Sequence, residues 1–103
     1  MRVIRSGQFV GQRAWDALDI AVLNGISVRL HWTDQPYIWH VNDGEEVFVV
    51  LAGQVKMLYR NNDQEDSVLL GLGDIFFADK GTEHVAHPQG IARVLVIEKS
   101  GSI

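Results

Sequence analysis

Two separated segments of the chain carry side chains that bind metal ions. Residues 39–53 contain an imidazole, an amide and two adjacent carboxylates just before an apolar run that ends in glycine. Residues 73–88 contain a second pair of imidazoles, His84 and His87. Imidazole nitrogens and carboxylate oxygens are common ligands of divalent transition metals. The two segments therefore predict a metal site between hydrophobic strands.

The spacing in the first segment suits one shared site. His40 and Asn42 are two residues apart, so in an extended strand they lie on one face about 6.6 Å apart. Glu45 and Glu46 must point to opposite faces of the strand that they begin. The alternation does not decide which of the two carboxylates points inward, so both choices stay open.

The remaining candidate side chains are one imidazole and two aromatic rings. His87 lies on the strand face opposite to His84, unless the strand breaks before Pro88. If it reaches a cavity, His87 is a candidate acid–base group, because an unperturbed imidazole has a pKa of about 6.5. Trp39 and Phe48 are candidates for the wall of a ligand cavity. The alternative for both rings is the core, where most aromatic residues of a small barrel lie.

Composition narrows the class of protein. The 103 residues fit one domain, residues 1–103, which is large enough for a modest core. The absence of cysteine excludes disulfides and thiolate metal sites. The net charge of −4, without a basic run, argues against a nucleic-acid partner. Neither a signal peptide nor a membrane-spanning run is visible, so we expect a soluble cytoplasmic protein without a membrane partner.

Short apolar stretches separated by Gly, Asn and Asp predict an all-β domain. Asn24-Gly25 is a strong hairpin signal. In the strand that follows, Arg29 and His31 alternate with apolar residues and share one face. Residues 9–18 are ambiguous between a helical turn and a loop, residues 3–4 are expected to start a short strand, and residues 37–40 are expected to be extended. The other predicted strands are residues 19–23, 26–32, 46–51, 54–60, 67–72, 74–77, 84–86 and 92–99.

Three of these strands are apolar on both faces, at residues 47–51, 75–77 and 94–97. An antiparallel strand with one solvated face should alternate, so the outer face of these strands must also be covered. The cover is either a second subunit or the N-terminal segment. We predict a homodimer through these strands, since twofold dimers are the commonest oligomers.

The spacing of the two segments resembles that of the two motifs of the cupins. The resemblance is to a small single-domain cupin and covers nearly the whole chain. In the first motif the matching residues are His40, Glu46 and Gly53; in the second they are Gly73, Gly81 and His84. The resemblance implies an antiparallel jelly roll, or double-stranded β-helix. It also implies one divalent metal ion held by His40, Glu46 and His84.

The chain departs from the cupin motifs at four positions. Asn42 stands where the second histidine of the first motif is expected, so it carries over only as a weak fourth ligand. Asp34 and Asp79 replace a glycine and a proline, and Pro88 replaces the final asparagine. Two imidazoles and one carboxylate remain, a set similar to the facial triad of non-haem iron(II) sites. Such a set suits Fe, Mn, Zn or Ni.

Three hypotheses for function follow. The first is a metal-dependent enzyme of oxygenase or isomerase type that acts on a small molecule. The second is a non-catalytic module that binds or senses a small ligand, with a degenerate or absent metal site. The third, a purely structural dimer, rests only on the strands that are apolar on both faces. The residues do not select a substrate, because one fold carries many functions.

Overall fold

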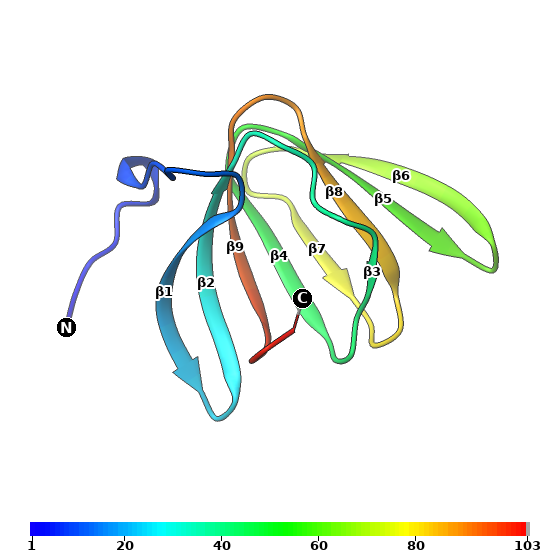
Figure 1. Ribbon diagram of the computed structural model, residues 1–103, viewed down its shortest axis with the longest axis horizontal. Helices are drawn as coiled ribbons and strands as arrows, with labels where there is room; N and C mark the ends of the chain where they lie inside the picture. The colour runs from blue at the N-terminus through cyan, green and yellow to red at the C-terminus, as the bar shows by residue number, and fades with distance from the viewer. Residues whose placement is uncertain (103) are drawn as a thin grey trace.

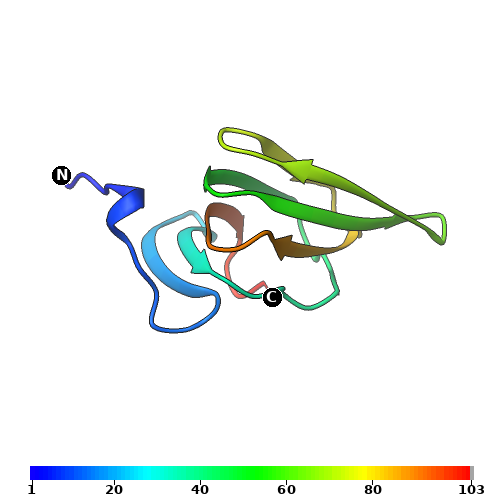
Figure 2. The ribbon, with the colours of Figure 1, turned by 90° about the horizontal axis from the view of Figure 1, so that it is seen from above.

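In residues 1–102, which the computed structural model describes, nine strands form two antiparallel sheets that face each other (Figures 1 and 2). This arrangement confirms the all-β prediction. A single 3₁₀ turn, η1 (Ser6–Gln8), precedes the strands, and no described helix is long and apolar enough to cross a membrane. The first sheet has the order β1 (Asp16–Leu23), β2 (Ile26–Thr33), β9 (Ala92–Lys99), β4 (Glu46–Ala52), β7 (Ile75–Ala78). The second has the order β3 (His40–Val41), β8 (Glu83–Pro88), β5 (Val55–Asn61), β6 (Gln64–Leu70).

Most strands lie where the sequence predicts them, and the differences are local. Asn24 and Gly25 both have positive φ and join β1 to β2, which confirms the hairpin prediction. Of the ambiguous residues 9–18, the last three belong to a strand, since β1 begins at Asp16. The predicted strand at residues 3–4 was wrong, because this segment leads into η1 instead of pairing with a sheet. In the stretch 37–40, regular pairing begins only at His40.

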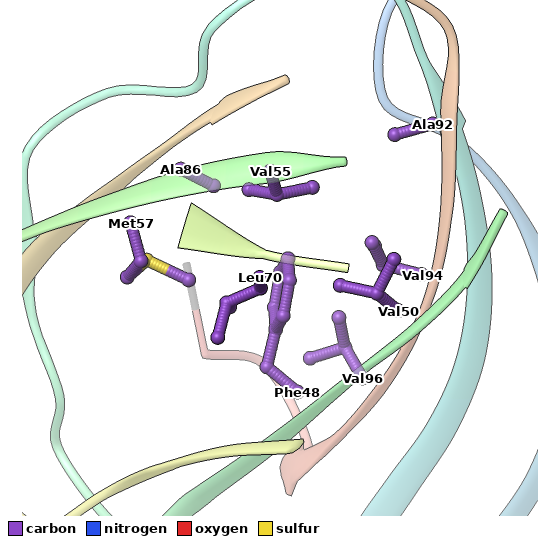
Figure 3. Packing of buried hydrophobic residues seen from close by; sticks show 9 residues of the cluster. All are labelled: Phe48, Val50, Val55, Met57, Leu70, Ala86, Ala92, Val94 and Val96. Carbon is purple, nitrogen blue, oxygen red and sulfur yellow. The ribbon is translucent and has the colours of Figure 1, made fainter. Parts of the chain in front are cut away.

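The buried hydrophobic residues pack together in the space between the sheets (Figure 3). On β4 and β9, Val50 lies opposite Val94, and Phe48 lies opposite Val96. The next pair that points inward along the same strands is polar, with Glu46 of β4 opposite Glu98 of β9. The apolar layers therefore close one end of the barrel and leave polar side chains at the other end. The core cluster consists of Phe48, Val50, Val55, Met57, Leu70, Ala86, Ala92, Val94 and Val96.

The N-terminal segment covers part of the outer face of the five-stranded sheet. Arg93 Nε donates a hydrogen bond of 2.8 Å to the carbonyl oxygen of Phe9, and Gly11 packs closely against the ring of Trp32. The edge strand β7 remains bare, with Ile75 at 64% and Phe77 at 52% exposure. The N-terminal segment thus covers the outer face of β2 and β9, whereas the apolar outer face of β7 stays exposed in the single chain.

Two glycines with the same backbone conformation allow a matched test of the packing between strands. Gly25 and Gly53 have φ of +80° and +75°. A Cβ on Gly25 would meet nothing within 4 Å, whereas a Cβ on Gly53 would lie 2.3 Å from the carbonyl oxygen of Ile91. Gly25→Ala should lower the free energy of unfolding by about 1–2 kcal/mol, the cost of the left-handed conformation. Gly53→Ala should lower it clearly more, because the main chain at Ile91 must also move. Urea unfolding measures both, and equal losses would contradict the close packing.

Candidate metal centre

His40, Glu46 and His84 come together at the polar end of the barrel. His40 and His84 are paired across β3 and β8, and Glu46 is the first residue of β4. Each of the three offers a donor atom, and these atoms all lie within 4.8 Å of one another. His84 and Glu46 are almost completely buried, at 2% and 6% exposure. The geometry thus places two imidazoles and one carboxylate around one point.

The packing of β4 decides which of the two adjacent glutamates points inward. Glu46 shares its strand face with Phe48 and Val50, which are both buried in the core. Glu45 is exposed at the rim. Turning β4 over would expose the two core side chains, so the hydrophobic effect fixes Glu46 inside.

Hydrogen bonds to the main chain orient both imidazoles. His40 Nδ1 lies 2.9 Å from the carbonyl oxygen of Ile38, and His84 Nδ1 lies 3.3 Å from that of Thr82. A carbonyl oxygen only accepts, so each of these contacts is a hydrogen bond when Nδ1 carries the proton and donates it. In the neutral rings, each Nε2 then has a free lone pair. This arrangement is typical of histidines that bind metals, whose other nitrogen is held by a hydrogen bond.

The contact between His84 and Glu46 needs a proton or a metal ion between the two atoms. His84 Nε2 lies 2.9 Å from Glu46 Oε1. A lone pair and a carboxylate repel each other, so either a proton or a metal ion must lie between them. Two ligands at about 2.1 Å from one metal and at right angles would be about 3 Å apart, close to the separation seen here. The residues present therefore fit a divalent metal ion.

Asn42 is bonded to the main chain next to the site. Its side-chain Nδ2 donates to the carbonyl oxygens of Ala78 and Asp79, at 3.4 and 3.5 Å. Its main-chain N donates to the main-chain oxygen of Thr82 at 3.1 Å, and its main-chain oxygen accepts from Gly81 N at 2.9 Å. Asn42 thus fixes the segment between β7 and β8 beside His84. Its role as a weak fourth ligand stays a prediction.

The other predicted site residues lie in different places. Phe48 is a core residue whose ring also walls the cavity beside the metal centre. Trp39 lines only the outer opening, and the guanidinium carbon of Arg60 lies 3.8 Å from the centre of its ring. His87 is half-buried and, in the part of the chain that is described, lines neither the cavity nor its opening, unlike His84.

Two spaces that share lining residues lie beside the metal centre. An inner cavity of about 60 Å³ lies between the sheets, and an outer vestibule of about 460 Å³ opens to the surface. Drug-sized ligands occupy pockets of about 300–1,000 Å³, so only the vestibule can hold a molecule of that size. Both spaces are lined by His40, Glu46, Glu98 and Ser102. The metal centre thus stands at the boundary between the two spaces.

Sequence reasoning missed the polar wall of the inner cavity. Arg29 and His31 line it from β2, and Trp15 and Tyr37 line it from the segments before β1 and β3. Burial lowers the pKa of His31 and raises that of Tyr37, so both side chains are neutral near pH 7. The signal was present in the alternation of residues 26–32, but it did not show which face points inward.

Glu98 is the second residue that sequence reasoning missed. It lies directly opposite Glu46 in the register of β4 and β9. Burial, and then the charge of Glu46, raise the pKa of Glu98 to about 7, while the charge of Arg29 acts in the opposite direction. No sequence motif marks this position, because the neighbourhood arises from pairing between distant strands.

Comparisons with known proteins give the fold. No protein-family model matches the sequence. No curated protein matches it either. Among solved structures, a cupin-2 domain protein from Shewanella frigidimarina is 24% identical with a TM-score of 0.76, over 86% of this chain and 84% of that one. The chain therefore has the cupin fold, which confirms the predicted double-stranded β-helix.

Two enzymes are similar in structure at lower identity. Hydroquinone 1,2-dioxygenase from Sphingomonas sp. TTNP3, solved with 4-hydroxybenzoate, is 17% identical with a TM-score of 0.77. The match covers 88% of this chain and 29% of that much longer one. Hydroquinone 1,2-dioxygenase PnpCD, solved with Cd²⁺ and 4-hydroxybenzonitrile, is 13% identical with a TM-score of 0.74, over 87% and 67% of the two chains. These likenesses describe the fold.

The raised pKa of Glu98 predicts how stability depends on pH. The ordinary value of 4.5 applies to the unfolded chain, whereas the folded protein keeps this proton up to about pH 7. The folded state therefore binds more protons between these values, and this group's contribution to stability falls as the pH rises from about 4.5 through 7. Glu98→Gln should remove that slope.

Urea unfolding of the protein with a chelator, from about pH 5 to pH 8, measures the effect. The groups that face Glu98 are Glu46, Arg29, Asp43 and His84, and they stay unchanged in the variant. Glu45→Gln, at the exposed neighbour of Glu46, is the control and should keep the slope. An identical pH profile for the parent and Glu98→Gln would contradict the assignment.

Proposed function

We propose that the chain binds one divalent metal ion through His40, Glu46 and His84 and acts as a metal-dependent enzyme, of oxygenase or isomerase type, on a small molecule. The observation that carries the proposal is the convergence of the three donor atoms within 4.8 Å at the boundary of a cavity. A bound metal would supply Lewis acidity to a substrate oxygen or, in the case of iron, redox chemistry. Fe, Mn, Zn and Ni all suit two imidazoles and one carboxylate.

The three protein ligands leave coordination positions free for a substrate. A molecule with an aromatic ring would have to lie in the vestibule, because the inner cavity of about 60 Å³ is too small. The ligands named for the two dioxygenases, 4-hydroxybenzoate and 4-hydroxybenzonitrile, are small aromatic molecules. They support a small organic substrate as the class to test first.

The residues of this chain would orient the metal ligands and the substrate. The hydrogen bonds from the imidazoles to Ile38 and Thr82 fix the direction of the Nε2 lone pairs. Arg29 is held at its Nε by Asp19 Oδ1, at 2.7 Å, while its side chain lines the inner cavity. This cation can therefore orient an oxygen of a ligand that reaches past the metal.

A second candidate function is a module that binds or senses a small ligand without turnover. The small inner cavity favours it, and so does Asn42, whose amide nitrogen is bonded to the main chain. Both functions predict ligand binding at the vestibule. Turnover of a bound small aromatic or carbonyl compound by the metal-loaded protein would distinguish the enzyme from the module.

Two histidines of β8 allow a matched test of the metal site. The protein, purified without a nickel column and then exposed to Fe²⁺, Mn²⁺ or Zn²⁺, should hold about one ion per chain by elemental analysis. His84→Ala should abolish binding, because it removes a buried donor, whereas His87→Ala should bind like the parent.

Two controls keep this test decisive. Glu46→Gln, which preserves the shape of the side chain, should also weaken binding, and circular dichroism should show that each variant is folded. Absence of metal in the folded parent under saturating conditions, or equal binding by His84→Ala, would refute the site.

We also propose that the chain forms a twofold homodimer through the outer face of β4, β7 and β9. Phe77 and Ile75 are exposed on β7, and in register they lie beside the half-buried Val47 and Val49 of β4. A second copy would cover the apolar surface of β7, whose Ile75 and Phe77 are exposed in the single chain.

Light scattering tests the dimer. The parent should have twice the chain mass of 11.5 kDa, and Phe77→Glu should have the mass of one chain, because a charge would be buried at the interface. Val22→Glu, at an exposed apolar residue of β1, should leave the mass unchanged. A parent of 11.5 kDa would rule out the dimer.

A further inference from the structure

Glu98 lies beside Glu46 on the neighbouring strand, and its carboxylate has no ion-pair partner among residues 1–102. The two residues are directly paired in the register of β4 and β9, and both line the inner cavity and the vestibule. Like charges directly opposite each other on a sheet are unfavourable, and partial burial increases the cost. An unfavourable pair of this kind indicates that the two carboxylates serve a function.

The neighbouring cations do not neutralise this pair. Glu46 Oε1 is already in contact with His84 Nε2, at 2.9 Å. Arg29 acts on Glu98 through its charge, but its Nε is bound to Asp19. Among residues 1–102, the Glu98 carboxylate has neither an ion pair nor a side-chain hydrogen bond within the usual distances. The pair therefore has one carboxylate free to bind a cation that enters the site.

The metal centre has three strong protein ligands, and Glu98 lies beside one of them, Glu46. The amide of Asn42, where an imidazole would complete a four-ligand site, donates its nitrogen to Ala78 and Asp79. Glu98 borders the same boundary between the cavity and the vestibule as His40 and Glu46. We infer that Glu98 is a second carboxylate ligand of the metal, reaching it from the β9 side of Glu46, whereas Asn42 is bonded on the β7 side.

This inference rests on the proposed function and gives the site a different chemistry. The Glu98 carboxylate lies outside the set of donors within 4.8 Å, so it must turn toward the ion when the metal binds. A glutamate side chain can do this by changing its staggered torsions, without movement of the strand. Two carboxylates balance the charge of a divalent ion, and their hard oxygens favour Mn²⁺ and Fe²⁺ more than an all-imidazole set would.

Titration calorimetry of Mn²⁺ into the metal-free protein tests the inference. Glu98→Gln should weaken Mn²⁺ binding by about tenfold to a hundredfold, the range found when groups that support a metal site are lost. Glu98→Asp keeps the charge but shortens the reach, so it should also weaken binding. The control Glu45→Gln, at the exposed rim, should bind like the parent.

A second measurement separates ligation from a merely structural role. Without metal, at about pH 8, Glu98→Gln should unfold at a higher urea concentration than the parent, because a repulsive charge is gone. With saturating Mn²⁺, the parent should gain more stability than the variant. A residue that only supported the fold would destabilise both forms on substitution.

The outcomes distinguish the two proposals. If the folded parent binds no Mn²⁺, Fe²⁺ or Zn²⁺, the proposed function fails, and the inference fails with it. If the parent binds metal, His84→Ala does not, and Glu98→Gln binds as tightly as the parent, only the inference is overturned. Binding by Glu98→Asp at the parent's affinity would likewise overturn it, because distant charge would then explain the effect.

Discussion

The buried contact between His84 Nε2 and Glu46 Oε1 is the interaction on which the site depends. It joins β8 in one sheet to β4 in the other, at 2.9 Å, across the open end of the barrel. Both groups are withdrawn from water, so an unpaired charge on either would be costly. The contact forms only with a proton or a metal ion between the two atoms, and a metal ion fits when the Thr82 oxygen holds the proton on Nδ1. Closure of the barrel end and binding of a cation are therefore coupled.

The apolar layers at the opposite end make this arrangement possible. Val50 against Val94 and Phe48 against Val96 hold β4 and β9 in one register. That register puts Glu46 inside and leaves Glu45 at the rim. A shift by one residue would exchange the two glutamates and expose the core at the same time. The chemistry at the open end is thus fixed by hydrophobic packing at the closed end.

The sequence could predict the features that depend on local pattern. The Asn24-Gly25 turn, the strand at residues 92–99 and the shared strand face of Arg29 and His31 follow from turn chemistry and alternation, although the alternation did not show that this face points inward. The spacing of His40, Glu46 and His84 placed three residues that the fold does bring together. It could not reveal Glu98, because this neighbour of Glu46 is set by pairing between strands far apart in the chain. Nor could it show that the amide of Asn42 is bonded to the main chain.

The sizes of the two spaces constrain any activity more than the choice of metal does. A metal held by His40, Glu46 and His84 would stand between a chamber of about 60 Å³ and an open vestibule of about 460 Å³. A substrate in the vestibule could place only one small group, such as a carbonyl or hydroxyl, past the metal toward Arg29 and His31. Since His31 and Tyr37 are neutral, Arg29 is the cationic side chain of the inner wall. The carboxylates of Glu46 and Glu98 line the same chamber, so a group that entered it would meet both signs of charge.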